Sequence, residues 1–107
     1  MSPICEIELR WLTPEEDGRT IPFCGEQYTP TARFAGEQDQ FSLILEFALG
    51  NMPNPKKADL RLLNPDLREV QRRICPGATL EIMEGAKVVA KCRVGKLIGA
   101  EAIVSDE

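Results

Sequence analysis

Apolar and polar residues alternate along several segments of the chain, which is the pattern of half-buried β-strands. The opening segment has charged residues between four apolar positions, Cys5, Ile7, Leu9 and Trp11. The clearest alternation begins at Gln40 and has five apolar positions, Phe41, Leu43, Leu45, Phe47 and Leu49. A large apolar side chain contributes roughly 1.5–3 kcal/mol when fully buried. We therefore expect both segments to be strands and the second to line the core.

The second half of the chain continues this pattern. A further strand is expected from Lys57, with the apolar positions Ala58, Leu60 and Leu62. Two more alternating runs flank the turn Glu84-Gly85 and predict a hairpin whose inward set is Ala78, Leu80, Ile82, Val88, Ala90, Cys92 and Val94. Beyond Gly95 the alternation is interrupted, because the next apolar residue is Leu97, and a β-bulge at that glycine would explain the interruption. Thr20–Phe23 and Thr31–Ala35 are shorter extended segments bounded by proline and glycine.

One short segment has a helical pattern instead. Asn64 is a suitable N-cap with Pro65 at the first helical position, and three apolar residues share one helical face, Leu67, Val70 and Ile74. We expect one or two helical turns near residues 66–73, ended by Pro76-Gly77.

Several short strands separated by turn residues predict an all-β sandwich or barrel. The 107 residues suit one domain, which we place at residues 1–99, followed by a loose acidic tail at residues 100–107. Hydrophobic residues make up 43% and charged residues 28%, as in globular chains.

The charge and the cysteine pattern narrow the function classes. The formal net charge of -4 opposes binding to nucleic acid and to anionic membranes, although the 13 Lys and Arg residues can still form a local basic patch. The segment from Met1 to Glu6 lacks the features of a signal peptide, so we expect a cytoplasmic protein. The four cysteines form no Cys-x-x-Cys pair and no histidine is present. We expect them to be small core residues and expect neither a metal nor a cofactor.

Three segments resemble the third domain of elongation factor Tu, in the order in which they occur there. Residues 12–23, Leu-Thr-Pro-Glu-Glu-Asp-Gly-Arg-Thr-Ile-Pro-Phe, resemble the first turn and second strand of that domain, with Asp17 in place of a glycine. Tyr28-Thr29-Pro30-Thr31 resembles the family's Tyr-Arg-Pro-Gln. Residues 82–90, Ile-Met-Glu-Gly-Ala-Lys-Val-Val-Ala, resemble its Ile-Arg-Glu-Gly-Gly-Arg-x-Val-Gly. The resemblance spans residues 4–97, nearly the whole chain.

The resemblance implies a closed six-stranded antiparallel Greek-key β-barrel used for docking. In the full-length family this barrel contacts a GTPase domain, the T stem of aminoacyl-tRNA and a nucleotide-exchange factor. The chain has no Gly-x-x-x-x-Gly-Lys-Ser/Thr loop, so nucleotide hydrolysis is not carried over. Thr29 and Met83 replace two of the family's arginines, and Lys87 keeps the charge of a third.

We therefore expect a non-catalytic module that binds another protein, with a function related to translation. Its candidate partner-binding residues are Arg19, Tyr28, Thr29, Met83, Glu84 and Lys87. The alternative is weak RNA binding through Arg33, Lys87, Lys91 and Arg93. The least favoured alternative is an enzyme that uses Cys24 or the acidic turn at residues 15–17. The arginines near residues 68–73 are interpreted as a solvated helix face in preference to a phosphate site.

Overall fold

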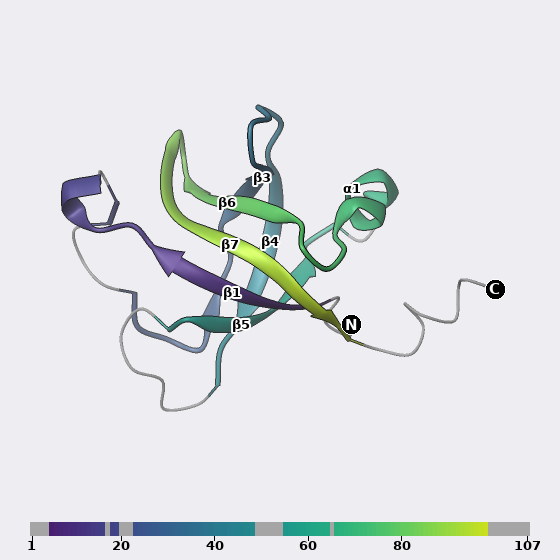
Figure 1. Cartoon of the computed structure of the whole chain (residues 1–107), viewed down its shortest axis with the longest axis horizontal. Helices are drawn as coiled ribbons and strands as arrows, with labels where there is room; N and C mark the ends of the chain where they lie inside the picture. The colour runs from purple at the N-terminus through teal and green to yellow at the C-terminus, as the bar shows by residue number, and fades with distance from the viewer. Residues whose placement is uncertain (1–4, 17, 20–22, 49–54, 65, 99–107) are drawn as a thin grey trace.

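A computed structural model describes residues 5–16, 18–19, 23–48, 55–64 and 66–98. Figure 1 shows that these residues form strands, with a short helix at one end of the molecule and a 3-10 turn at the other. The elements in chain order are β1 (Cys5–Trp11), η1 (Pro14–Glu16), β2 (Gln27–Tyr28), β3 (Thr31–Phe34), β4 (Phe41–Glu46), β5 (Lys57–Leu62), α1 (Arg68–Arg73), β6 (Thr79–Glu84) and β7 (Lys87–Leu97).

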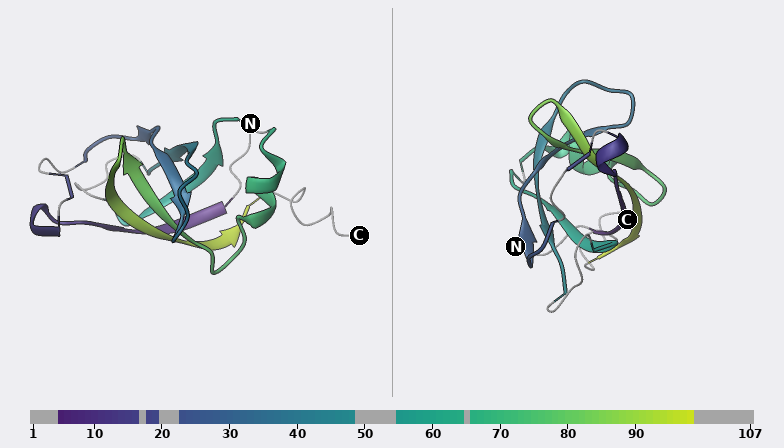
Figure 2. Two further views of the ribbon diagram at one scale, coloured as in Figure 1. Left: turned by 90° about the horizontal axis from the view of Figure 1, so that it is seen from above. Right: turned by 90° about the vertical axis from the view of Figure 1, so that its left-hand side faces the viewer.

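The strands close into a six-stranded antiparallel Greek-key barrel, as expected. Each strand of the ring β4-β3-β6-β7-β1-β5 is hydrogen-bonded to its neighbours, and pairing of β5 with β4 closes it. The short β2 pairs with the C-terminal end of β4, and β3 pairs with its N-terminal end. Between them, a hydrogen bond from the Leu43 amide to the Pro30 carbonyl continues the pairing from β2 to β3. Thus β2 and β3 are one strand interrupted at Thr29-Pro30. Seen along its length, the molecule is a ring of strands (Figure 2).

The alternating positions of the strands form the core of this ring. The apolar set of β1 and β4 is buried while the residues between are exposed or half-buried, because successive side chains of a strand point to opposite faces. No polar or charged residue is fully buried among the described residues. Burial of the alternating set confirms most of the expected inward residues and leaves the charged residues on the outside of the barrel. Val88 was expected to face the core, but it is half-buried, because a bulge in β7 turns Val89 inward in its place. The expected inward residue Leu49 lies outside the described residues.

Two β-bulges occur in β7. Cys5 pairs with Leu97 and Ile7 with Val94, so β7 has an extra residue near Gly95, where the apolar phase predicts one. The other was not predicted: Ile82 pairs with Ala90 while Met83 pairs with Val88, which leaves Val89 as the extra residue. A bulge turns two consecutive side chains toward the same side, and both Val89 and Ala90 are buried.

The helix differs from the expectation in its start. α1 begins at Arg68, and its N-cap residue Leu67 makes no capping side-chain bond. Asn64 does not cap the helix, because its side chain accepts a bond from the Asp66 amide at 3.0 Å and closes a local turn before it. Leu67, Val70 and Ile74 pack on the core as predicted. α1 therefore covers one end of the barrel.

Other expectations have mixed outcomes. Thr31–Ala35 corresponds to β3, whereas Phe23 belongs to no strand and residues 20–22 lie outside the described residues. The acidic tail at residues 100–107 also lies outside them. Within the described part of the chain, no helix has the length and apolarity needed to cross a membrane.

Candidate functional site

The end of the barrel opposite α1 is closed by an aromatic cluster, which we call the aromatic end, formed by Trp11, Phe23, Tyr28 and Phe47. The Phe23 ring lies at the centre of this cluster and stacks on the Trp11 ring, with 5.8 Å between the ring centres. The centre of the Phe23 ring also lies 4.8 Å from that of Tyr28 and 5.3 Å from that of Phe47. Trp11 also donates its indole N–H to the Pro55 carbonyl at 2.7 Å. Aromatic pairs at such distances add roughly 0.5–1.5 kcal/mol beyond burial. The cluster thus holds the segment between β1 and β2 against the barrel.

Three of the predicted partner-binding residues meet above this cluster. Glu84 at the end of β6 accepts a hydrogen bond from the Tyr28 hydroxyl and forms an ion pair with Arg19. The Arg19 guanidinium also lies 5.9 Å from the centre of the Phe23 ring. Burial, and then the neighbouring Glu84, raises the pKa of Tyr28, so its hydroxyl stays protonated and donates. These three residues connect segments far apart in the chain.

The other predicted partner-binding residues are placed differently. Thr29 is exposed beside Tyr28, and Lys87 is half-buried opposite Glu84 across the hairpin turn. Met83 was expected on the outside, but it is only 1% exposed and cannot contact a partner directly. In the alternation of β6 the Met83 side chain points away from the core. Its burial therefore depends on neighbouring segments of the chain, which the alternation within one strand does not predict. Met83 is therefore withdrawn from the candidate surface.

The residues of the RNA alternative lie on the side of the barrel. Arg33 on β3 forms an ion pair with Glu81 on β6 at 2.7 Å. Lys91 lies opposite Glu81, and Arg93 lies opposite both Thr79 and Glu8. The positive residues therefore share the outer face of neighbouring strands, but carboxylates lie between them. Lys87 is near the aromatic end, beyond the bulge at Val89.

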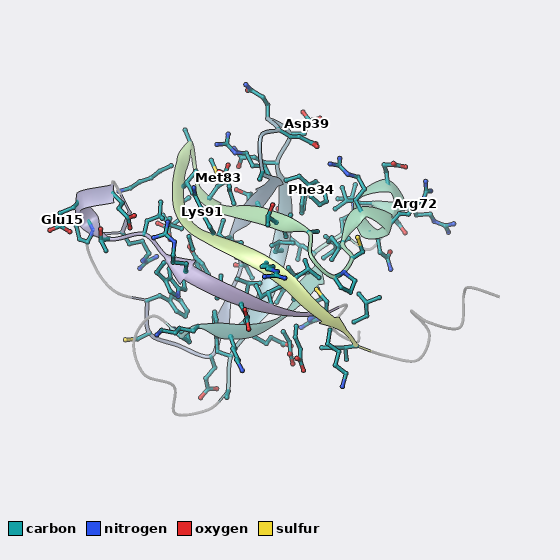
Figure 3. All side chains as sticks on the ribbon, viewed as in Figure 1. Glu15, Phe34, Asp39, Arg72, Met83 and Lys91 are labelled. Atoms are coloured by element: carbon teal, nitrogen blue, oxygen red, sulfur yellow. The ribbon has the colours of Figure 1, made fainter. Side chains whose placement is uncertain are left out.

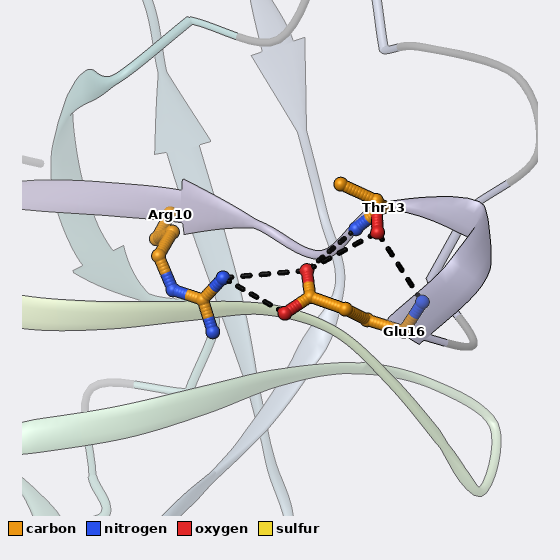
Figure 4. A network of polar contacts seen from close by, with 3 residues as sticks. All are labelled: Arg10, Thr13 and Glu16. Atoms are coloured by element: carbon orange, nitrogen blue, oxygen red, sulfur yellow. Dashed lines mark hydrogen bonds and ion pairs between the residues drawn. The ribbon is translucent and has the colours of Figure 1, made fainter.

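Glu16 of the acidic turn is held by hydrogen bonds (Figure 4), whereas Asp17 lies outside the described residues. The Thr13 amide donates to the Glu16 carboxylate at 2.9 Å, the Glu16 amide donates to the Thr13 hydroxyl at 3.2 Å, and Arg10 forms an ion pair with Glu16 at 3.2 Å. This is a capping box around η1. The bond from the Thr13 amide, and then that from Arg10, lowers the pKa of Glu16. A general acid needs a raised pKa, so Glu16 is poorly suited to that role.

The cysteines fall into two pairs by exposure. Cys5 and Cys92 are buried, and burial raises the pKa of each thiol to about 12. Cys24 and Cys75 are exposed, which corrects the expectation that all four cysteines are small core residues. Cys75 follows Ile74, whose side chain turns inward and completes the helix contact with the core. Among the described residues no group of His, Cys, Asp or Glu side chains is arranged to hold a metal.

The arginines of α1 are engaged locally. Arg72 forms an ion pair with Glu69 on the same helix at 3.1 Å, and Arg73 forms one with Glu37. The Arg73 guanidinium also lies 4.0 Å from the centre of the Phe34 ring. The labels in Figure 3 place Arg72 on the helix and Phe34 in the adjacent strand. These pairs agree with the solvated helix face preferred from the sequence.

The alternation of residues did not reveal two features of the molecule. Trp11 and Phe23 pack beside Tyr28 at the aromatic end, although only Tyr28 was predicted to be a partner-binding residue. Arg10 on β1 lies opposite Lys91 on β7, which brings two cations together. The alternation assigns both cations to outer faces, but their adjacency depends on strand register.

Comparison of the chain with protein-family models and with curated proteins finds no match.

Proposed function

We propose that this protein is a non-catalytic docking module that contacts another protein through the aromatic end of the barrel. The observation that supports the proposal is the meeting of Arg19, Tyr28 and Glu84 from three separate segments. They form an ordered rim around partly buried aromatic rings, and interfaces commonly combine aromatic anchors and arginine with a polar rim. Exposed Thr29 beside them offers direct access for a partner.

The chemistry of the described residues supports a binding role over catalysis. The buried thiols have raised pKa values, whereas a nucleophilic cysteine needs a lowered one. Glu16 is held by Thr13 and Arg10. Cys24 is the thiol candidate of the enzyme alternative, and reaction with a thiol probe far faster than that of a model cysteine would favour that alternative.

The resemblance to the third domain of elongation factor Tu supports a partner in translation and a cytoplasmic setting. The segments that carry the resemblance include Arg19, Tyr28 and Glu84, the residues that meet at the aromatic end. In that family the domain is used for docking, so the proposal assigns the same use to this barrel.

Affinity purification from the native cell, with and without ribonuclease, tests the proposal. Thr29→Glu places a charged side chain on the exposed rim and should abolish recovery of a defined protein that resists ribonuclease. Arg72→Glu changes an exposed residue on α1, at the opposite end of the barrel, and should leave recovery unchanged. Equal recovery by both variants would contradict docking at the aromatic end. Loss of protein partners after ribonuclease would instead favour RNA binding, the alternative that the shared outer face of Arg33, Lys91 and Arg93 supports.

A further inference from the structure

The outer faces of the neighbouring strands β1 and β7 carry three cations, Arg10, Lys91 and Arg93, which we call the basic strip. Lys91 and Arg93 are exposed and lie two positions apart on β7, so both point outward. Arg10 lies directly opposite Lys91 on β1. Like charges at directly opposed positions of an antiparallel pair destabilise it. The fold thus places two cations side by side on adjacent strands.

The carboxylates nearest to the basic strip leave Lys91 and Arg93 without an ion pair. Glu81 lies opposite Lys91, but it accepts a bond from Arg33 at 2.7 Å. Arg10 itself is paired with Glu16 at 3.2 Å. Lys91 and Arg93 form no ion pair with any described residue, although Glu8 lies opposite Arg93. Two cationic side chains on one strand are therefore available to a ligand.

A hollow of about 450 Å³ lies over these strands. Its lining includes Glu8, Arg10, Thr79, Glu81, Lys91 and Arg93. Figure 3 labels Lys91 on β7, away from the helix, and none of the four aromatic residues of the aromatic end lines the hollow. The hollow is thus separate from the proposed docking end and has cations on two adjacent strands.

The spacing of the cations favours an extended acidic peptide. Residues i and i+2 of any extended chain lie on one side at about the same spacing, so alternate carboxylates of a peptide match Lys91 and Arg93. Continuous polyanions fit less well, because Glu8 and Glu81 interrupt the positive surface and the whole chain has a formal net charge of -4.

We propose that the basic strip binds an extended acidic peptide segment with carboxylates at alternate positions. Lys91 and Arg93 bind successive carboxylates, and Arg10 adds positive charge from β1. The inference goes beyond the proposed docking at the aromatic end, because it assigns a second surface and a ligand chemistry. Either of the two proposals can fail without the other.

Fluorescence anisotropy with a labelled peptide of alternating glutamate and serine tests this inference. The double variant Lys91→Gln and Arg93→Gln should weaken binding about tenfold, because two exposed charge pairs are lost. The matched control, Arg68→Gln with Lys96→Gln, removes the same charge from exposed positions outside the hollow and should bind like the unchanged protein. A peptide of the same composition with its glutamates in one block should bind more weakly than the alternating one.

Chemical shift mapping of the unchanged protein with the same peptide gives an independent readout. The largest shifts are expected at β7 and β1 around Lys91. No binding of the alternating peptide, or equal loss of binding in both double variants, would overturn the inference. Tighter binding of a single-stranded RNA oligonucleotide that depends on Lys91 and Arg93 would also overturn it and assign the basic strip to phosphate. A Thr29→Glu variant that still binds the peptide would show that the two surfaces act separately.

Discussion

The Tyr28 hydroxyl donates a hydrogen bond to Glu84, which connects β2 to β6 although the two strands share no ladder in the described structure. Glu84 is also the ion-pair partner of Arg19. One carboxylate thus fastens two segments that precede β3 to the hairpin of β6 and β7. The position of the proposed docking rim depends on this carboxylate.

Tyr28→Phe should lower the free energy of unfolding by about 1 kcal/mol, because one hydrogen bond in a partly buried setting is lost. Glu84→Ala should cost more, about 1–2 kcal/mol, because the acceptor for Tyr28 and the partner of Arg19 are removed together. Denaturant unfolding monitored by the fluorescence of the single tryptophan, Trp11, measures both. Glu84→Gln, which keeps an acceptor, is the control and should fall between Glu84→Ala and the unchanged protein. If Tyr28→Phe were as stable as the unchanged protein, water would fully replace the hydrogen bond between the Tyr28 hydroxyl and Glu84.

Gly18 is expected to tolerate no side chain. A Cβ atom at this position would lie 2.3 Å from the Leu12 carbonyl oxygen, which is backbone and cannot turn away. Gly18→Ala should therefore cost about 1–3 kcal/mol, the range for overpacking, and shift the loop that carries Arg19. Gly36→Ala is the comparison, because nothing lies within 4 Å of its Cβ and only its φ of +86° opposes the change. Thermal unfolding of both variants checks the order, and a smaller loss for Gly18→Ala would contradict it.

Asp59 should destabilise the protein at neutral pH. It lies opposite Glu6 on β1 and Glu46 on β4, and burial, then Glu6 and Glu46, raises its pKa above 3.8. A carboxyl whose pKa is raised in the folded state binds protons more tightly there than in the unfolded chain. Its contribution therefore becomes more favourable as the pH falls toward the folded pKa.

Asp59→Asn should raise stability at pH 7 by a few tenths to about 1 kcal/mol, the range for opposed like charges. This gain in stability should shrink as the pH falls toward the pKa that the Asp59 carboxyl has in the unfolded chain. Urea unfolding at a series of pH values measures it. Glu16→Gln should behave oppositely, because the pKa of Glu16 is lowered and its contribution is present above 4.5 and lost on acidification. A pH-independent effect of Asp59→Asn would contradict the like-charge explanation.

The thiols should react as two pairs. Cys24 and Cys75 are exposed and should react with a thiol reagent in the folded protein, whereas Cys5 and Cys92 should react only on unfolding. Titration with a chromogenic disulfide reagent, with and without denaturant, counts each pair. Cys24→Ser and Cys75→Ser should each remove one fast-reacting thiol. A fast phase that survives in the double variant would show that the barrel opens near Cys5 or Cys92.

The alternation of apolar residues was sufficient to predict most strands and their inward faces. This worked best for β1 and β4, because a side-chain period of two residues is a local property that hydrophobic burial enforces. The helix was also predicted in place, but Asn64 was assigned the wrong role because an Asn side chain can close a turn as readily as it caps a helix. Exposure of Cys75 and burial of Met83 were missed because both depend on neighbours from other segments.

The amino-acid sequence by itself determined most of the residues that face the core, that the chain is all-β, and which residues can carry charge to the surface. Only the tertiary structure decided that Arg19, Tyr28 and Glu84 meet, and that Arg10 lies beside Lys91. The reason is that neighbours across strands are set by register and ring closure. These depend on pairings between distant segments, and a shift of one residue would exchange every such neighbour.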